Sequence, residues 1–290
     1  MQRRSVSLAC LFICLTHSRG IAQLNEQRQR EMAIALSPDP KAKRPIASHD
    51  TLFMEEMTWM EVRDAIAGGR TTVLVGTGGI EMNGPYVVTG KHNFVVRVNM
   101  AEIAKKLGNC LISPVVPFVP EGSFDPPTGH MRYPGSITVR DETYRALLAD
   151  IVASLKAHGF RNIILMGDSF ENQEGMRVVA DDLSRQWGSS SMVRVHFVPE
   201  YYSARGTAMS AAGIAEKFEG HHDNLYNSAV LMTLDPTLIR ADQRRAVRLF
   251  SINGVTLDPA NQTVTLGRKL VAQTADITVA AIRQKIASSR

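Results

Sequence analysis

Short apolar runs alternate with longer amphipathic stretches along most of the chain. The run from Thr72 to Val75 has the continuous apolar character of a strand that is buried on both faces. Before it, Thr58-Trp-Met-Glu61 has the spacing of a capping box, which predicts a helix that ends at Gly68. Downstream, the pattern predicts strands at residues 111–116, 162–166 and 193–198 and helices at residues 94–107, 141–158, 172–187 and 265–286.

This order of strand, helix and strand is typical of βαβ units. It predicts an α/β fold with a mainly parallel sheet that helices cover on both faces. In such sheets, binding and catalytic sites lie at the carboxyl ends of the strands. The loops that follow the strands are therefore the first places to search for chemistry.

The first 50 residues do not share this pattern. Residues 1–22 begin with Arg3 and Arg4, followed by a short apolar run and small residues around Ile21, which is typical of a secretory signal peptide cleaved near Ala22. Residues 23–50 are rich in Gln, Arg, Lys and Pro and have few large apolar residues, so we expect a flexible lead or a surface strap. The organisation predicted is a signal peptide (1–22), a lead (23–50) and one domain (51–290).

Loss of the signal peptide changes the charge and the cysteine content. The whole chain has 33 basic and 28 acidic residues, and removing the three arginines of the signal leaves 30 basic residues, so the mature protein is nearly neutral. The run from Arg240 to Arg248 is interpreted as a solvated helix face rather than a nucleic-acid contact. Cys110 stays as a lone cysteine in an apolar stretch, so we expect a small buried hydrophobe and no internal disulfide.

Three loops at expected strand ends concentrate polar and small residues. They are Gly76 to Asn93, Gly167 to Gln173, and His221 to Ser228. On one rim of a parallel sheet their side chains could converge, and a carboxylate and imidazole cluster suits Zn²⁺ or Mn²⁺. The candidate ligands and proton carriers in these loops are Glu81, His92, Asp168, Glu171, His221 and Asp223.

A purely structural interpretation is open for the same loops. Glycines after strands are common because turns need positive φ angles, and acidic residues there often only cap the next helix. Asp168 or Ser169 could serve as such a cap for the helix expected at Asn172.

The three loops resemble motifs of the creatininase (creatinine amidohydrolase) family. That family has E-Q-H-G-P-H-L-P-x-G-T-D after its first strand, and Glu81 to His92 reads E-M-N-G-P-Y-V-V-T-G-K-H. Its N-G-H-x-E-N or G-D-H-G-G-N turn is similar to Gly167 to Asn172, and its H-x-G-x-x-E-T-S stretch is similar to His221 to Ser228. Gly129 to Val139 and Lys156 to Asp168 add further matches, so the resemblance extends from about Thr51 to the C-terminus.

The resemblance implies a three-layer α/β/α sandwich with a mainly parallel sheet, an oligomer, and two divalent metals held by five side chains. Glu81 keeps a family carboxylate, and Glu171 lies where creatininase has its second glutamate. The other three ligand positions differ: the family's first histidine is Asn83, its bridging aspartate is His92, and its later histidine is Ser169.

These differences favour one metal instead of two. A carboxylate has two oxygens with which to bridge two ions, whereas a neutral imidazole has one lone pair to give. We therefore expect one divalent metal, Zn or Mn, with Glu81, His92 and Glu171 as its ligands.

The proton-transfer residues also follow from the resemblance. His221 matches a family catalytic histidine, and either His221 or Asp168 is expected to carry protons. His130 could orient substrate or shuttle protons, or could be a structural histidine in a Gly- and Pro-rich loop. The family's glutamate is replaced by Tyr226.

Two functions follow from these patterns. The first is a periplasmic or secreted metal-dependent hydrolase that cleaves an amide or other C–N bond of a small molecule. The second is a catalytically inactive relative in which the pocket serves binding or assembly. In both cases we expect a homo-oligomer with no nucleic-acid partner and no membrane partner after signal cleavage.

Overall fold

The structure is a computed structural model that describes residues 24–32 and 36–289. The chain divides into two compact units, residues 1–47 and 48–290. In the first unit, residues 24–32 form a helix where the sequence predicts a flexible lead, and the predicted signal peptide lies outside the described residues. No helix among the described residues has both the length and the apolar character needed to cross a membrane.

The second unit is built on a four-stranded sheet whose order is β2-β1-β3-β4. All three strand pairs are parallel, and Thr72 to Thr77 of β1 pair in register with Asn162 to Gly167 of β3. The strands are β1 (Thr72–Thr77), β2 (Cys110–Ile112), β3 (Asn162–Gly167) and β4 (Arg194–Phe197). The predicted parallel sheet is confirmed.

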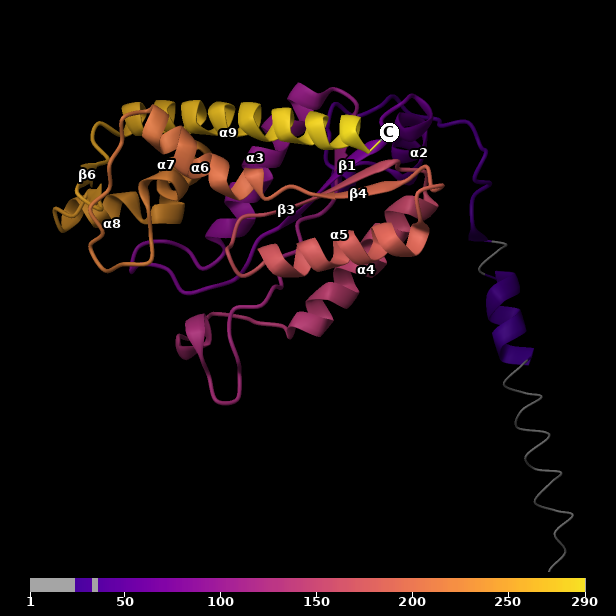
Figure 1. Cartoon of the computed structure of the whole chain (residues 1–290), viewed down its shortest axis with the longest axis horizontal. Helices are drawn as coiled ribbons and strands as arrows, with labels where there is room; N and C mark the ends of the chain where they lie inside the picture. Colours follow the sequence, from indigo (N-terminus) through magenta and orange to yellow (C-terminus); the bar gives the residue numbers. More distant parts are fainter. Residues whose placement is uncertain (1–23, 33–35, 290) are drawn as a thin grey trace, which may run out of the picture. The chain divides into compact units, whose positions relative to one another are not determined.

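Helices cover both faces of this sheet, because successive side chains of each strand point to opposite faces. Val73 and Val75 pack into a core with α4 and α5, whereas Leu74 between them packs into a second core with α3 and α9. Figure 1 shows the resulting three layers, with α9 and α6 on one side of the sheet and α4 and α5 on the other. The helices that cover the sheet are α2 (Trp59–Ala67), α3 (Lys91–Leu107), α4 (Asp141–Ala157), α5 (Gln173–Trp187), α6 (Glu200–Ala211) and α9 (Ala260–Ser288).

A third core lies beyond the sheet, where α9 packs against α7. Gly267 allows the close approach of these two helices, since a Cβ at this position would lie 2.3 Å from the carbonyl oxygen of Ala229. The elements of this region are α7 (Leu225–Leu234), α8 (Ala241–Ala246) and the antiparallel pair β5 (Ser251–Ile252) and β6 (Val255–Thr256). Single-turn helices complete the fold at η1 (Met54–Glu56), η2 (Gly129–Arg132) and η3 (Pro236–Ile239).

A local signal in the sequence explains where α2 begins. The side chain of Thr58 accepts a hydrogen bond from the backbone N–H of Glu61, and the Glu61 carboxylate accepts one from the backbone N–H of Thr58, so the predicted capping box begins α2. Cys110 is fully buried, as predicted. These elements formed as expected because their signals are contained within a few neighbouring residues.

Two interpretations of the sequence were wrong. The first is that the predicted pattern has no helix directly after the strand at residues 193–198, whereas Glu200 to Ala211 form helix α6, which packs on β3 and α9. The basic run from Arg240 is not simply a solvated face, because Arg244 is buried and its Nη2 lies 2.8 Å from Oδ2 of Asp223. The guanidinium also donates to the carbonyl oxygens of Ile239 and Ser251, so it holds three chain segments together.

One strand residue makes the fold sensitive to acid. Burial lowers the pKa of His196 in β4 to about 4, and the positive charges of Lys285 and Arg194 add to this effect. The unfolded value is about 6.5, so between these two pH values the unfolded chain binds more protons than the folded chain. The contribution of His196 to stability is therefore complete above pH 6.5 and falls as the pH falls toward 4.

We expect His196→Gln to reduce this sensitivity. The wild type should lose up to about 2 kcal/mol of unfolding free energy from this group between pH 7 and pH 5, and the variant should lack that loss. Urea denaturation at both pH values measures the difference, with His158→Gln at the exposed end of α4 as the matched control. An equal pH dependence in wild type and His196→Gln would contradict the prediction.

Candidate metal centre

The loops that follow β1 and β3 meet at the carboxyl edge of the sheet. Asn172 holds them together, since its Nδ2 donates to the carbonyl oxygen of Gly78 at 2.7 Å and to Oγ1 of Thr77 at 3.0 Å. The backbone of Glu81 donates to the carbonyl oxygen of Thr89, and Ile80 bridges to Ile137. These bonds fix the backbone from which the Glu81 side chain projects.

The carboxylate of Glu81 is the centre of the cluster and is 1% exposed. Its Oε1 accepts from Nε2 of His92 at 2.8 Å and from Nε2 of His222 at 3.0 Å. Nζ of the buried Lys91 lies 3.1 Å from the same oxygen, and Nε2 of His130 lies 3.4 Å from Oε2. Four nitrogen groups from three separate parts of the sequence, at residues 91–92, 130 and 222, therefore surround one carboxylate.

These groups determine the charge of Glu81. Burial by itself would raise the pKa of Glu81, but hydrogen bonds from His222 and His92 and the positive charges of His92 and Lys91 outweigh it and lower the pKa far below its usual value. The carboxylate is therefore ionised at neutral pH and able to bind a cation.

His92 joins Glu81 to a second buried carboxylate. Its Nδ1 lies 2.6 Å from Oδ2 of Asp168, while its Nε2 faces Glu81. Burial opposes the charged imidazole, but the hydrogen bonds that His92 donates to Asp168 and Glu81 raise the pKa of His92. Since both acceptors are carboxylate oxygens, His92 donates from both ring nitrogens and has no lone pair for a metal in this arrangement.

Asp168 is fully buried and has further partners. Nη1 of Arg205 lies 3.2 Å from its Oδ1, and the hydroxyl of Tyr201 donates to the same oxygen at 2.8 Å. Burial would raise the pKa of Asp168, but the charge of Arg205 and the hydrogen bonds from His92 and Tyr201 lower it. Asp168 therefore orients His92 as an ionised carboxylate and does not cap α5, whose N-cap is Asn172.

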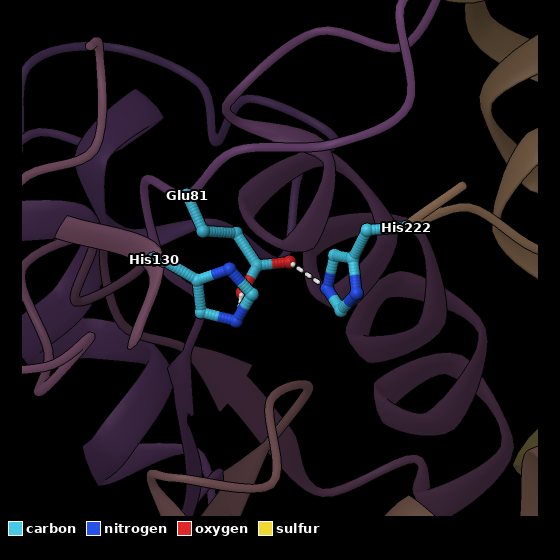
Figure 2. Close-up of side chains that lie close together, drawn as sticks. All are labelled: Glu81, His130 and His222. Carbon is cyan, nitrogen blue, oxygen red and sulfur yellow. Dashed lines mark hydrogen bonds and ion pairs between the residues drawn. The ribbon is translucent and has the colours of Figure 1, made fainter. Parts of the chain in front are cut away.

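Glu81, His130 and His222 form a group that could hold a metal ion. One ligand atom from each lies within 4.8 Å of the others. Figure 2 shows both imidazole rings turned toward the carboxylate of Glu81, and their centroids are 4.7 Å apart. Burial lowers the pKa of His130, which favours the neutral imidazole that binds metals. The donor set of two imidazoles and one carboxylate is one that Zn²⁺ accepts.

A second glutamate lies against this group. Glu121 is 1% exposed, and neither of its carboxylate oxygens has a hydrogen-bond donor among the residues that the structure describes. Burial raises the pKa of Glu121 to about 9, and the negative charges of Glu81 and Glu171 add to the effect. Glu121 is therefore protonated at neutral pH, and only in that form can it donate a hydrogen bond to Glu81.

The structure brings three of the predicted site residues into contact with one another. Glu81, His92 and Asp168 come together in one hydrogen-bonded chain. Glu171 accepts a hydrogen bond from Ser169 at 2.6 Å, and its charge acts on Glu121 and His130. The ligand set Glu81, His92 and Glu171 stays a prediction, while the geometry offers Glu81 with His130 and His222.

The structure separates two neighbouring histidines, of which only His221 was expected to belong to the site. His221 is exposed and lines a hollow of about 320 Å³ together with Lys91 and His222. His222 is the residue whose ring reaches Glu81, and the doublet at this position was its only signal in the sequence. Tyr226, in place of the family's glutamate, is buried with its hydroxyl 3.1 Å from Oδ1 of Asn99 and 2.9 Å from Oγ1 of Thr274.

Comparisons with known proteins show which family and which proteins this chain is similar to. Residues 55–282 match the creatininase family, described as creatinine amidohydrolase. The creatinine amidohydrolase of Pseudomonas putida is 21% identical over 200 residues, which cover 67% of this chain and 75% of the relative. This relative is named as an amidohydrolase.

Solved structures of creatininases share the fold. A structure described as "Creatininase Mn" has a TM-score of 0.59 at 20% identity and covers 81% of this chain and 99% of its own. A mutant creatininase described as "Zn-Zn type" has a TM-score of 0.57 at 19% identity, with 82% and 99% covered. The predicted fold and the predicted resemblance are confirmed, and the chain belongs to the creatininase family.

Proposed function

We propose that this protein is a metal-dependent hydrolase that cleaves an amide or other C–N bond of a small molecule. The observation that carries the proposal is the convergence of Glu81, His130 and His222 within 4.8 Å at the carboxyl edge of the sheet. One divalent ion, Zn²⁺ or Mn²⁺, is the cofactor proposed for these three side chains. Such an ion supplies Lewis-acid chemistry, because it polarises a carbonyl oxygen and makes water a better nucleophile.

The residues around the hollow have roles that follow from their positions. Lys91 is buried beside Glu81 and lines the hollow, so its ammonium group can stabilise negative charge that develops on a substrate oxygen. His221 lines the same hollow from the solvent side and is placed to give a proton to the leaving nitrogen. Asp168 has a supporting role, because it is buried behind His92.

The size of the hollow supports a small substrate. Its volume of about 320 Å³ is at the lower end of the range for pockets that bind small molecules. The sequence of residues 1–22 supports a periplasmic or secreted location, and the family supports a homo-oligomer. The names of the relatives point to cyclic amides related to creatinine as the first compounds to assay.

One observation favours a second function, that of an inactive relative whose pocket serves binding or assembly. Lys91 and His92 already provide two cationic partners for Glu81, so the buried carboxylate is compensated without a metal. Metal content distinguishes the two functions.

We expect the purified protein to bind about one Zn²⁺ or Mn²⁺ per chain, since one cluster of ligands is proposed. Glu81→Gln, His130→Ala and His222→Ala should each weaken binding by about tenfold or more, because each removes a ligand. Elemental analysis and titration against a chromogenic chelator measure stoichiometry and affinity. His221→Ala is the matched control and should keep the wild-type affinity. A wild-type protein that takes up neither ion would refute the hydrolase proposal.

Lys91→Met tests whether the lysine compensates Glu81. Removing one partner of a buried ion pair leaves the other charge uncompensated in a low dielectric, so the metal-free protein should lose about 3 kcal/mol of unfolding free energy. Metal affinity should rise, because Lys91 no longer competes for Oε1 of Glu81. Thermal melts with and without Zn²⁺ measure both effects, and Lys105→Met at an exposed position of α3 is the control. Unchanged stability together with unchanged affinity would show that Lys91 has no such role.

A further inference from the structure

The carboxyl group of Glu121 is buried without hydrogen-bond donors for its oxygens among the described residues. Its side chain is 1% exposed, and both carboxylate oxygens lack a hydrogen-bond donor among the described residues. Leaving a buried polar group without a partner costs free energy, so most such groups in proteins are paired. Two unpaired oxygens on one buried carboxyl group therefore call for an explanation.

The backbone holds Glu121 firmly in this position. Its N–H donates to Oγ1 of Thr138 at 2.9 Å, and its carbonyl oxygen accepts from the N–H of His130 at 3.0 Å. Gly79 provides the space for the carboxyl group, since a Cβ at residue 79 would lie 2.3 Å from Oε1 of Glu121. The backbone hydrogen bond from His130 to Glu121 therefore holds Glu121 beside the candidate ligand His130.

The neighbours of Glu121 are acidic. The charges of the buried Glu81 and of the exposed Glu171 both act on Glu121, and the positive charge of Lys91 opposes them only in part, so a negative charge on Glu121 is repelled. A proton on Glu121 relieves the repulsion and allows one hydrogen bond to Glu81, but it leaves the second oxygen without a donor. A divalent cation would compensate the negative charges and could accept an oxygen of Glu121 as a ligand.

We propose that Glu121 is a ligand of the divalent cation and completes the set formed by Glu81, His130 and His222. This inference rests on the proposed function. It gives the ion two imidazoles and two carboxylates, and the two carboxylates balance its double positive charge. The three ligand atoms within 4.8 Å of one another do not include one from Glu121, so its carboxylate would have to shift toward the ion in order to bind it.

Glu121→Gln separates a ligand from a structural residue. Glutamine has the shape of the protonated acid, and its amide can still donate to Glu81, so the metal-free variant should melt at the wild-type temperature. Its amide is a much weaker ligand than a carboxylate, so affinity for Zn²⁺ and Mn²⁺ should fall by about tenfold or more. Loss of a group that only orients a ligand already lowers metal affinity by about tenfold, so loss of a ligand should cost at least as much. The melting temperature should also rise less on addition of metal.

The experiment is a titration of ZnCl₂ and MnCl₂ into full-length metal-free protein, together with thermal melts. Glu142→Gln, at an exposed position in the first turn of α4, is the matched control. A second variant, Gly79→Ala, displaces the carboxyl group without changing its charge and should also weaken metal binding.

The outcomes distinguish this inference from the function on which it rests. Weaker binding by Glu121→Gln with an unchanged metal-free melt supports the ligand role. Equal or tighter binding by Glu121→Gln than by wild type overturns it and leaves the hydrolase proposal intact. A wild type that binds no metal overturns both.

Discussion

The burial of the Glu81 carboxylate is the constraint on which the arrangement of the site depends. An ionised carboxylate is stable in such a place only if cations or donors surround it. Here those groups are Lys91 and His92 from the first turn of α3, and His130 and His222 from two separate loops. One charge in the loop after β1 therefore specifies where three separate parts of the sequence must meet.

The repeating architecture was predictable from the sequence because its signals are local and periodic. The apolar run at Thr72 indicates a strand, and the capping box at Thr58 indicates a helix start, without reference to the rest of the chain. Parallel pairing then places Glu81 and Asp168 at the same edge of the sheet, since each follows a neighbouring strand. The position of the site at this edge of the sheet could therefore be predicted from the sequence.

It was harder to predict which residues form the candidate ligand set. Whether His221 or His222 turns inward depends on the path of an irregular segment, where no periodicity indicates direction. Lys91 was missed because α3 begins at Lys91, before the helix start expected from the apolar pattern. Glu121 lies in a long loop, and its burial results from space left by Gly79, which only the folded backbone reveals.

The buried ion pair between Arg244 and Asp223 has a consequence for how the site can change. Asp223 directly follows His222, and Arg244 fixes it to segments that pack in the third core, whereas Glu81 and His130 are anchored near the sheet. The candidate ligands thus come from segments anchored at two places in the domain, and the backbone hydrogen bond from Gly84 to His222 joins those segments. Substitutions along that junction would alter the spacing of the ligands while leaving each ligand intact, so the site can change without any change in its ligands.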